Sequence, residues 1–226
     1  MASNRVTKAP DLVPLRNVLV STFDKSGLAE LVRAIASLCP GSRFFSTGGT
    51  LEAIRGALGD RASSRVVAVS DYTGQPEMQG GLVKTLDWKI YLGLLAETGN
   101  ERHAADLERM GAVAFDAVIV NLYPFAAAAA DPYFNPEELR QRIDIGGPAM
   151  VRAAAKNFLR VASVSDPSQY GALVAELKDF EGSTGLSFRR RLAAEAFERT
   201  SRFDALVAEK LAALDIETLD ATYEAE

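Results

Sequence analysis

Short apolar runs alternate along the chain with stretches in which apolar residues recur every three or four positions. The runs have the length and the β-branched content of buried strands, whereas the spaced stretches are typical of amphipathic helices. The pattern predicts strands over residues 17–21, 43–46, 65–70, 115–122 and 160–165. It predicts helices over residues 27–39, 50–58, 101–111, 166–180 and 187–214, the last broken at most near residues 200–202, and another helix that begins at Asn135 and Pro136.

Strands and helices therefore alternate in sequence order, which is typical of an α/β fold. The strands have few polar positions, so we expect a doubly wound, mainly parallel sheet with helices on both faces. The sequence holds no repeat and no second set of elements. One domain over residues 15–214 is predicted, with residues 1–14 as a loose N-terminal tail and residues 215–226 as a C-terminal tail.

Composition limits the class of protein. The chain has 226 residues, which is enough to bury a full core without disulfides, and Cys39 is its single cysteine. We expect Cys39 to be a packing residue in a protein of the reducing cytoplasm. The net charge of −5 is unlike that of a nucleic-acid binder, and no apolar run has the length of a membrane span. We therefore expect a soluble protein with neither a nucleic-acid nor a membrane partner.

The chain has one histidine, His103, which lies in a polar helical stretch and is expected at the surface. With so little imidazole and thiolate, the sequence offers almost no metal ligands of those kinds, so no metal site is predicted. If the protein is an enzyme, its acid–base chemistry falls to Lys, Asp, Glu or Tyr side chains.

The informative motifs directly follow predicted strands, and in doubly wound sheets ligands bind at the carboxyl ends of strands. These motifs are "STFDKSG" (21–27), "STGGT" (46–50), "SDYTGQPEMQGGLVKTL" (70–86), "NLYPF" (121–125) and "IDIGG" (143–147). In "STGGT", two glycines allow close approach of the backbone to an anion, and hydroxyl and amide groups can donate hydrogen bonds to it. Lys25 and Lys84 add positive charge at the same end of the sheet.

The segment "DIGGPAMVRAAAKN" (144–157) has two interpretations. In the first, Asp144 caps a helix that begins with glycines and a proline, and Lys156 is a solvated cation on that helix. In the second, the helix N-terminus faces an anion, with a proton-transfer pair beside it. This segment alone does not decide between them.

Taken together, the motifs resemble those of the IMP cyclohydrolase domain of bifunctional purine-biosynthesis enzymes, the AICAR transformylase/IMP cyclohydrolase family. The resemblance covers residues 16–213, and "NLYPF" followed by "DIGG…AAKN" is its most specific part. It implies a methylglyoxal-synthase-like fold and closure of the second purine ring. In that reaction, the carboxamide nitrogen of formylated aminoimidazole carboxamide ribotide attacks the formamide carbon, and water leaves to give inosine monophosphate.

The resemblance also implies partners and site residues. It implies no cofactor, a homodimer, and a stand-alone cyclohydrolase with a separate transformylase protein as partner, since the sequence has no transformylase domain. The implied catalytic residues are Lys84, Tyr123, Asp144 and Lys156. Asp144 and Lys156 would handle the carboxamide proton as a coupled pair, while Lys84 and Tyr123 would stabilise the former formyl oxygen; which group is acid and which is base stays open. The implied substrate-binding residues are Ser21, Lys25, Ser46, Thr47, Gly48, Gly49, Thr50, Thr85, Asn121, Gly146 and Gly147, the glycine pair 146–147 also facing developing negative charge.

The chain departs from the family pattern beside the expected site. Where relatives have an arginine before "VKTL" and "HPK.HGG" after it, this chain has Leu82, Asp87, Trp88, Tyr91 and Leu92. Phe23 replaces a small hydroxyl residue, and Lys89 is the candidate for the missing positive charge.

Two other functions remain open at this point. One is a regulatory module of the same fold that binds a purine ribotide without converting it. The other is methylglyoxal synthesis from a triose phosphate, for which Asp24 or Asp71 would be the catalytic carboxylate.

Overall fold

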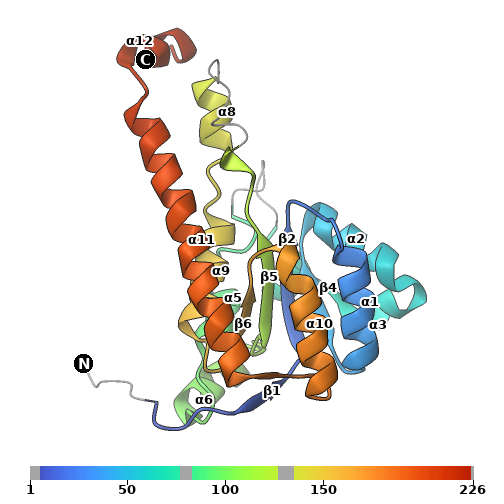
Figure 1. Ribbon diagram of the computed structural model, residues 1–226. Helices are drawn as coiled ribbons and strands as arrows, with labels where there is room; N and C mark the ends of the chain where they lie inside the picture. The colour runs from blue at the N-terminus through green and yellow to red at the C-terminus, as the bar shows by residue number, and fades with distance from the viewer. Residues whose placement is uncertain (1–5, 77–82, 127–134, 225–226) are drawn as a thin grey trace.

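A computed structural model describes residues 6–76, 83–126 and 135–224 (Figure 1). The strands are β1 (Leu12–Pro14), β2 (Asn17–Thr22), β3 (Arg43–Ser46), β4 (Val66–Ala68), β5 (Ala117–Asn121), β6 (Ala162–Val164) and β7 (Ser183–Gly185). The longer helices are α1 (Leu28–Leu38), α2 (Gly48–Leu58), α5 (Trp88–Leu95), α6 (Glu101–Arg109), α9 (Gly146–Lys156), α10 (Tyr170–Asp179) and α11 (Leu186–Ala212). The shorter ones are η1 (Gly59–Arg61), α3 (Ala62–Arg65), α4 (Val69–Thr73), α8 (Pro136–Gln141), η3 (Pro167–Gln169) and α12 (Ile216–Thr222).

Five strands form one parallel sheet in the order β4–β3–β2–β5–β6. The five predicted strands are therefore confirmed. From β2 the chain winds outward through β3 and β4, and it then returns to place β5 and β6 on the other side of β2. The direction of winding changes between β2 and β5, which is the position where doubly wound sheets bind ligands.

Both faces of the sheet are covered, as the sequence predicts. Val18 and Val20 of β2 pack toward α1, α2 and α10, whereas Leu19 between them packs toward α5 and α9 on the opposite face. This alternation follows from the two-residue period of a strand. Figure 1 shows α1, α2 and α10 on one side of the sheet and α5, α9 and α11 on the other. The predicted α/β fold is confirmed.

A two-stranded antiparallel ribbon of β1 and β7 lies outside the main sheet. The fully buried Arg189 guanidinium donates to the carbonyl oxygens of Pro10 (2.7 Å), Leu159 (3.1 Å) and Thr184. The expected loose tail over residues 1–14 is thus ordered in part, because this buried cation gathers backbone carbonyls from three separate segments.

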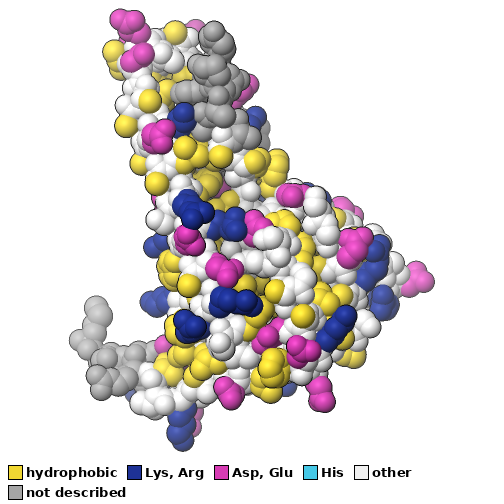
Figure 2. Space-filling model, in the orientation of Figure 1, with side chains coloured by type: hydrophobic (Ala, Val, Ile, Leu, Met, Phe, Trp, Pro, Cys, Tyr) yellow, Lys and Arg dark blue, Asp and Glu magenta, His cyan; other side chains and the backbone are white. Residues whose placement is uncertain are grey.

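Helix α11 runs unbroken through residues 200–202, where the sequence pattern allowed a break, and extends away from the sheet, with α8 beside its far end (Figure 1). In the segment expected as a C-terminal tail, α12 packs against α8, and the Tyr223 hydroxyl donates to Glu137 at 2.7 Å. Figure 2 shows hydrophobic side chains along this extension, where Leu211 is 48% exposed.

Helix α5 lies in a segment for which the sequence pattern predicts no helix. A Cβ atom at Gly93 would lie 2.3 Å from the Val113 carbonyl oxygen, so glycine allows α5 to approach the chain before β5. The packing prediction for Cys39 is confirmed, since the side chain is buried in the core. Among the helices in the described ranges, none has the length and apolar character needed to cross a membrane.

Candidate active site

A cleft of about 340 Å³ opens at the carboxyl ends of β2, β3 and β5, where the winding direction changes. All but two of the residues expected at the site line it. Those present are Ser21, Lys25, Thr47, Gly48, Gly49, Thr50, Lys84, Thr85, Asn121, Tyr123, Asp144, Gly146 and Gly147. The sheet topology thus brings together loops that are more than a hundred residues apart in sequence.

The glycine turn that begins α2 forms one end of the cleft. Gly48 has a φ of +49°, a conformation that L side chains rarely adopt, and Thr47 at the N-cap position makes no side-chain capping bond. A Cβ atom at Gly48 would lie 3.2 Å from the Lys84 ammonium nitrogen, and one at Gly49 would lie 4.0 Å from that of Lys25. Two ammonium groups therefore flank the positive end of a helix dipole, an arrangement that favours an anion.

The hydroxyl groups of two residues in "STGGT" form hydrogen bonds to the backbone of β2. Ser46 is fully buried and donates to the Val20 carbonyl oxygen at 2.8 Å, so it does not line the cleft, contrary to expectation. Thr50 lines the cleft, but its hydroxyl accepts from the Thr22 amide (3.2 Å) and donates to the Thr22 carbonyl (3.0 Å). The side chain of Thr50 thus ties the β2 and β3 loops together.

Asn121 holds the loop after β2. Its side-chain oxygen accepts from the backbone amides of Phe23 (2.7 Å) and Asp24 (2.9 Å), and its side-chain nitrogen donates to the Asp24 carbonyl (2.7 Å). The family resemblance implies that Asn121 binds substrate. In the structure, its amide group binds the loop that carries Lys25 and Phe23 into the cleft.

Asp144 lies directly against the start of α9. Its carboxylate accepts from the Gly147 amide at 2.8 Å, and a Cβ atom at Gly147 would lie 2.3 Å from the other carboxylate oxygen. The glycine is therefore required for this close approach. Burial raises the pKa of Asp144, while the backbone amides of Gly147 and Tyr123 partly oppose this shift. The Gly147 amide, expected to face developing negative charge, instead binds Asp144.

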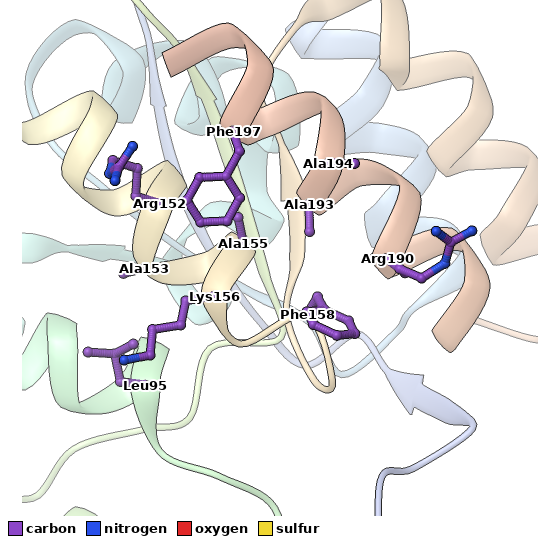
Figure 3. A pocket seen from close by; sticks show the side chains of 10 residues that line it. All are labelled: Leu95, Arg152, Ala153, Ala155, Lys156, Phe158, Arg190, Ala193, Ala194 and Phe197. Atoms are coloured by element: carbon purple, nitrogen blue, oxygen red, sulfur yellow. The ribbon is translucent and has the colours of Figure 1, made fainter. Parts of the chain in front are cut away.

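Lys156 does not lie in the cleft. It ends α9, ten residues beyond Gly146, or about 15 Å along the helix axis. It lines a separate groove between α9 and α11, where its side chain points toward Leu95; the apolar Phe158 lines the same groove (Figure 3). The coupled pair of Asp144 and Lys156 is therefore not formed within one chain, because helical rise separates the two residues.

Residues missed by the sequence analysis complete the cleft walls: Thr22, Leu86, Val120, Gln141, Ile143, Ile145 and Met150. Ile145, which is 60% exposed, lies inside the "IDIGG" motif and could have been found there. Gln141 is the last residue of α8, a helix with no motif of its own, so the sequence carried no signal for it.

Among the described positions that depart from the family pattern, Phe23 lines the cleft, whereas Asp87, Trp88, Tyr91 and Leu92 do not. Asp87 caps α5 by accepting from the Lys89 amide at 2.8 Å, and Trp88 is 64% exposed. The Lys89 ammonium donates to the Tyr72 carbonyl at 3.0 Å and does not line the cleft, so it does not replace the missing cation. The Tyr91 hydroxyl is buried without a described partner, and burial, with the charge of Asp144, raises its pKa to about 12.

Leu92 is half-buried in α5, and Leu82 lies outside the described residues.

The positions of the acidic side chains bear on methylglyoxal synthesis, one of the functions that the sequence leaves open. Among the described residues that line the cleft, Asp144 is the one acidic side chain. Asp24 accepts from the Ser26 amide at 2.8 Å outside this lining, and Asp71 lies outside it too, in the first turn of α4. Within the described residues, no carboxylate lines the cleft at the glycine turn of α2, where methylglyoxal synthesis would need one.

Comparison with known proteins gives the family. A family model described as the MGS-like domain matches residues 27–149. The chain belongs to the MGS-like domain family. A second family model, the AICARFT/IMPCHase bienzyme, matches residues 154–226 of this MGS-like chain.

Individual relatives agree with this assignment. The MGS-like chain is 48% identical over 199 residues to the bifunctional purine biosynthesis protein PurH of Dinoroseobacter shibae, with 87% of this chain and 36% of that protein covered. It is 42% identical over 211 residues to PurH of Rhizobium rhizogenes, with 93% and 38% covered. The chain thus spans less than two fifths of the length of these relatives.

A solved structure supports the fold. The crystal structure of ForH superposes with a TM-score of 0.73 at 31% identity, covering 87% of this chain and 99% of that one.

Proposed function

We propose that this chain closes the second purine ring, converting 5-formamidoimidazole-4-carboxamide ribotide to inosine monophosphate with release of water. The observation that carries the proposal is the convergence of Lys84, Tyr123 and Asp144 on one cleft that also contains the anion-favouring turn of α2. The similarity to bifunctional purine biosynthesis proteins supports the same reaction.

The ribotide phosphate would bind at the start of α2. The first amides of a helix have no intrahelical partner, so those of Gly48 and Gly49 can donate to phosphate oxygens. Lys25 and Lys84 lie beside the same turn and neutralise part of the phosphate charge. With the phosphate there, the heterocycle extends toward Tyr123, Asp144 and Gly146 on the other side of the cleft.

Asp144 would accept the carboxamide proton. An amide nitrogen is a poor nucleophile, so the attack on the formyl carbon needs a base placed at that proton. The buried environment that raises the pKa of the Asp144 carboxylate makes it a stronger base than a solvated aspartate. The Gly147 amide fixes its orientation through the 2.8 Å hydrogen bond.

Lys84 and Tyr123 would act on the former formyl oxygen. When the carboxamide nitrogen bonds to the formyl carbon, this oxygen gains negative charge, which an ammonium and a phenol can stabilise through hydrogen bonds. The oxygen takes one proton to become a hydroxyl and a second as it leaves as water, while the former formamide nitrogen loses its proton and the ring C=N bond forms. Lys84 and Tyr123 can both deliver protons to this oxygen, because both line the cleft.

Lys156 enters this proposal only through a second copy of the chain. The resemblance implies a catalytic role for it, yet its ammonium lies outside the cleft of its own chain. It makes no ion pair with a described residue, and the groove around it is largely apolar. We therefore include a homodimer in the proposal, with Lys156 of one copy reaching the cleft of the other. Supply of the formylated substrate by a separate transformylase protein stays a prediction from the resemblance.

A direct assay tests the reaction. The purified chain is incubated with the formylated ribotide, and ultraviolet absorbance follows formation of the purine ring. Wild-type protein should turn over substrate, and Lys84→Ala and Asp144→Ala should each lose about a hundredfold or more in kcat. Lys178→Ala and Asp179→Asn, which change exposed residues of α10, are matched controls that should retain activity.

The same experiment addresses the regulatory alternative. Tight binding of inosine monophosphate without turnover of the formylated ribotide would contradict the enzyme and support a ribotide-binding module. Absence of both binding and turnover would contradict both functions.

A further inference from the structure

Two half-exposed aromatic side chains lie side by side in the cleft. Phe23 follows β2 and Tyr123 follows β5, and these strands are hydrogen-bonded neighbours at the centre of the sheet. Their ring centroids are 5.0 Å apart with an interplanar angle of 50°. This tilted arrangement is within the range that aromatic pairs prefer. At this separation the rings contact one another, so no ligand ring fits between them.

The backbone around this pair is held from both strands. Asn121, two residues before Tyr123, binds the backbone amide of Phe23 at 2.7 Å and thereby fixes the loop after β2 to the end of β5. Pro124 restricts the backbone of Tyr123 on its other side. Phe23 is therefore presented to the Tyr123 ring from a fixed position.

The side chain of Tyr123 has little else to order it. It is 47% exposed, and its hydroxyl makes no hydrogen bond to a residue in the described ranges. Within those ranges, the Phe23 ring is the aromatic group in contact with it. A half-exposed tyrosine exchanges between rotamers unless a neighbour selects one of them.

We propose that Phe23 is a positioning residue for Tyr123, selecting the rotamer that directs its hydroxyl to the reacting atoms. The catalytic role of Tyr123 rests on the proposed function, whereas the contact between the two rings does not. A contact of this type changes a conformational equilibrium by about two- to tenfold. The small hydroxyl residue that the family resemblance gives for this position has no ring with which to do so.

Kinetic constants distinguish positioning from substrate binding. If Phe23 only lined the cleft for the ligand, its removal would raise KM and leave kcat unchanged. If it positions Tyr123, Phe23→Leu should lower kcat about two- to tenfold with little change in KM. Phe23→Tyr, which keeps a ring, should restore most of kcat. In a Tyr123→Phe background, Phe23→Leu should cause no further loss, because the group that it positions is already absent.

A second measurement does not depend on activity. The six tyrosines are labelled with 3-fluorotyrosine, and the Tyr123 fluorine signal is assigned by its loss in Tyr123→Phe. Phe23→Leu should shift and broaden this signal, since a neighbouring ring current is lost and more rotamers are populated. Phe180→Leu is the matched control, because Phe180 is 42% exposed and is far from the cleft lining. Thermal unfolding confirms that each variant is folded.

The results separate this inference from the proposed function. An unchanged Tyr123 signal in Phe23→Leu, or an increase in KM alone, would overturn the positioning role. If wild-type protein shows no turnover, the proposed reaction is wrong, and the fluorine signal still decides whether Phe23 orders Tyr123.

Discussion

At the scale of single residues, the buried position of the ionisable Asp144 lowers the stability of the folded protein. Burial raises the pKa of its carboxyl group, so ionised Asp144 disfavours the folded state at neutral pH. This penalty is absent below the pKa of the unfolded chain, near 4, and grows as pH rises through the raised pKa of the folded chain. Such a balance between activity and stability is common in active sites.

Asp144→Asn should therefore abolish turnover and stabilise the fold at neutral pH. The asparagine keeps an oxygen to accept from the Gly147 amide but carries no charge. We expect Tm to rise by roughly 2–4 °C at pH 7, the shift that about 1 kcal/mol produces in a chain of this size. Calorimetry between pH 3.5 and 7 should show this difference shrink in acid, where the aspartate is protonated. A constant difference across that range would contradict the assignment.

Gly147 gives a second test at this scale. In Gly147→Ala, the new methyl group would overlap an Asp144 carboxylate oxygen, so the carboxylate must move. A displacement of about 1 Å at a catalytic group costs on the order of a hundredfold in rate.

The control for this variant is another helical glycine. Gly171→Ala in α10 meets no atom within 4 Å, and it should stabilise the protein by up to about 1 kcal/mol without changing kcat. Equal activity of the two variants in the absorbance assay would exclude a role for the approach of Asp144 to α9.

At the scale of elements, a buried arginine joins α5 to the sheet. The Arg160 guanidinium donates to the carbonyl oxygens of Gly93 (2.7 Å), Ala96 (3.2 Å) and Phe115 and lies 3.5 Å from the Asp116 carboxylate. Asp116 in turn accepts from the backbone amides of Arg16 and Asn17 at the start of β2. These contacts fix the edge of the sheet opposite the cleft.

Arg160→Ala should lower the free energy of unfolding by about 3–5 kcal/mol, because it leaves a buried carboxylate and several carbonyl groups without partners. The exposed pair of Arg109 and Asp106 is the control. Its 2.8 Å separation is shorter, yet Arg109→Ala should cost no more than about 1 kcal/mol. Urea unfolding measures the free energy of unfolding of both variants. Similar decreases would show that burial does not determine how much these ion pairs contribute to stability.

At the scale of the whole molecule, Lys156 connects the single chain to the proposed homodimer. If each cleft uses Asp144 of its own chain and Lys156 of its partner, Asp144→Asn and Lys156→Ala should each be inactive alone. In a two-fold dimer, a mixed pair then has one cleft with both residues intact.

Mixing the two inactive variants should therefore restore activity. With random exchange of subunits, half of the dimers are mixed and half of their clefts are complete, giving about a quarter of wild-type activity. Sedimentation of the wild-type chain provides the accompanying measurement of its oligomeric state. A lack of recovery despite subunit exchange, or full activity of Lys156→Ala, would contradict a contribution from the partner.

The sequence by itself determined the five central strands and the face that each helix buries, because burial on both sides leaves long apolar runs and helix faces that can be recognised locally. It also determined which loops meet, since the carboxyl ends of parallel strands lie at one edge. Local patterns did not show α5 or the ribbon of β1 and β7. These depend on distant partners, such as the approach of Gly93 to Val113 and the carbonyl groups bound by Arg189.

Only the tertiary structure decided where individual polar side chains point. Ser46, Asn121 and Lys156 all lie in motifs that predict contact with substrate. Yet Ser46 is buried against β2, Asn121 binds a neighbouring loop, and Lys156 ends a helix far from the cleft. A motif fixes the residue type and its place in the chain, whereas the partner of a side chain depends on which atoms folding brings within hydrogen-bond distance.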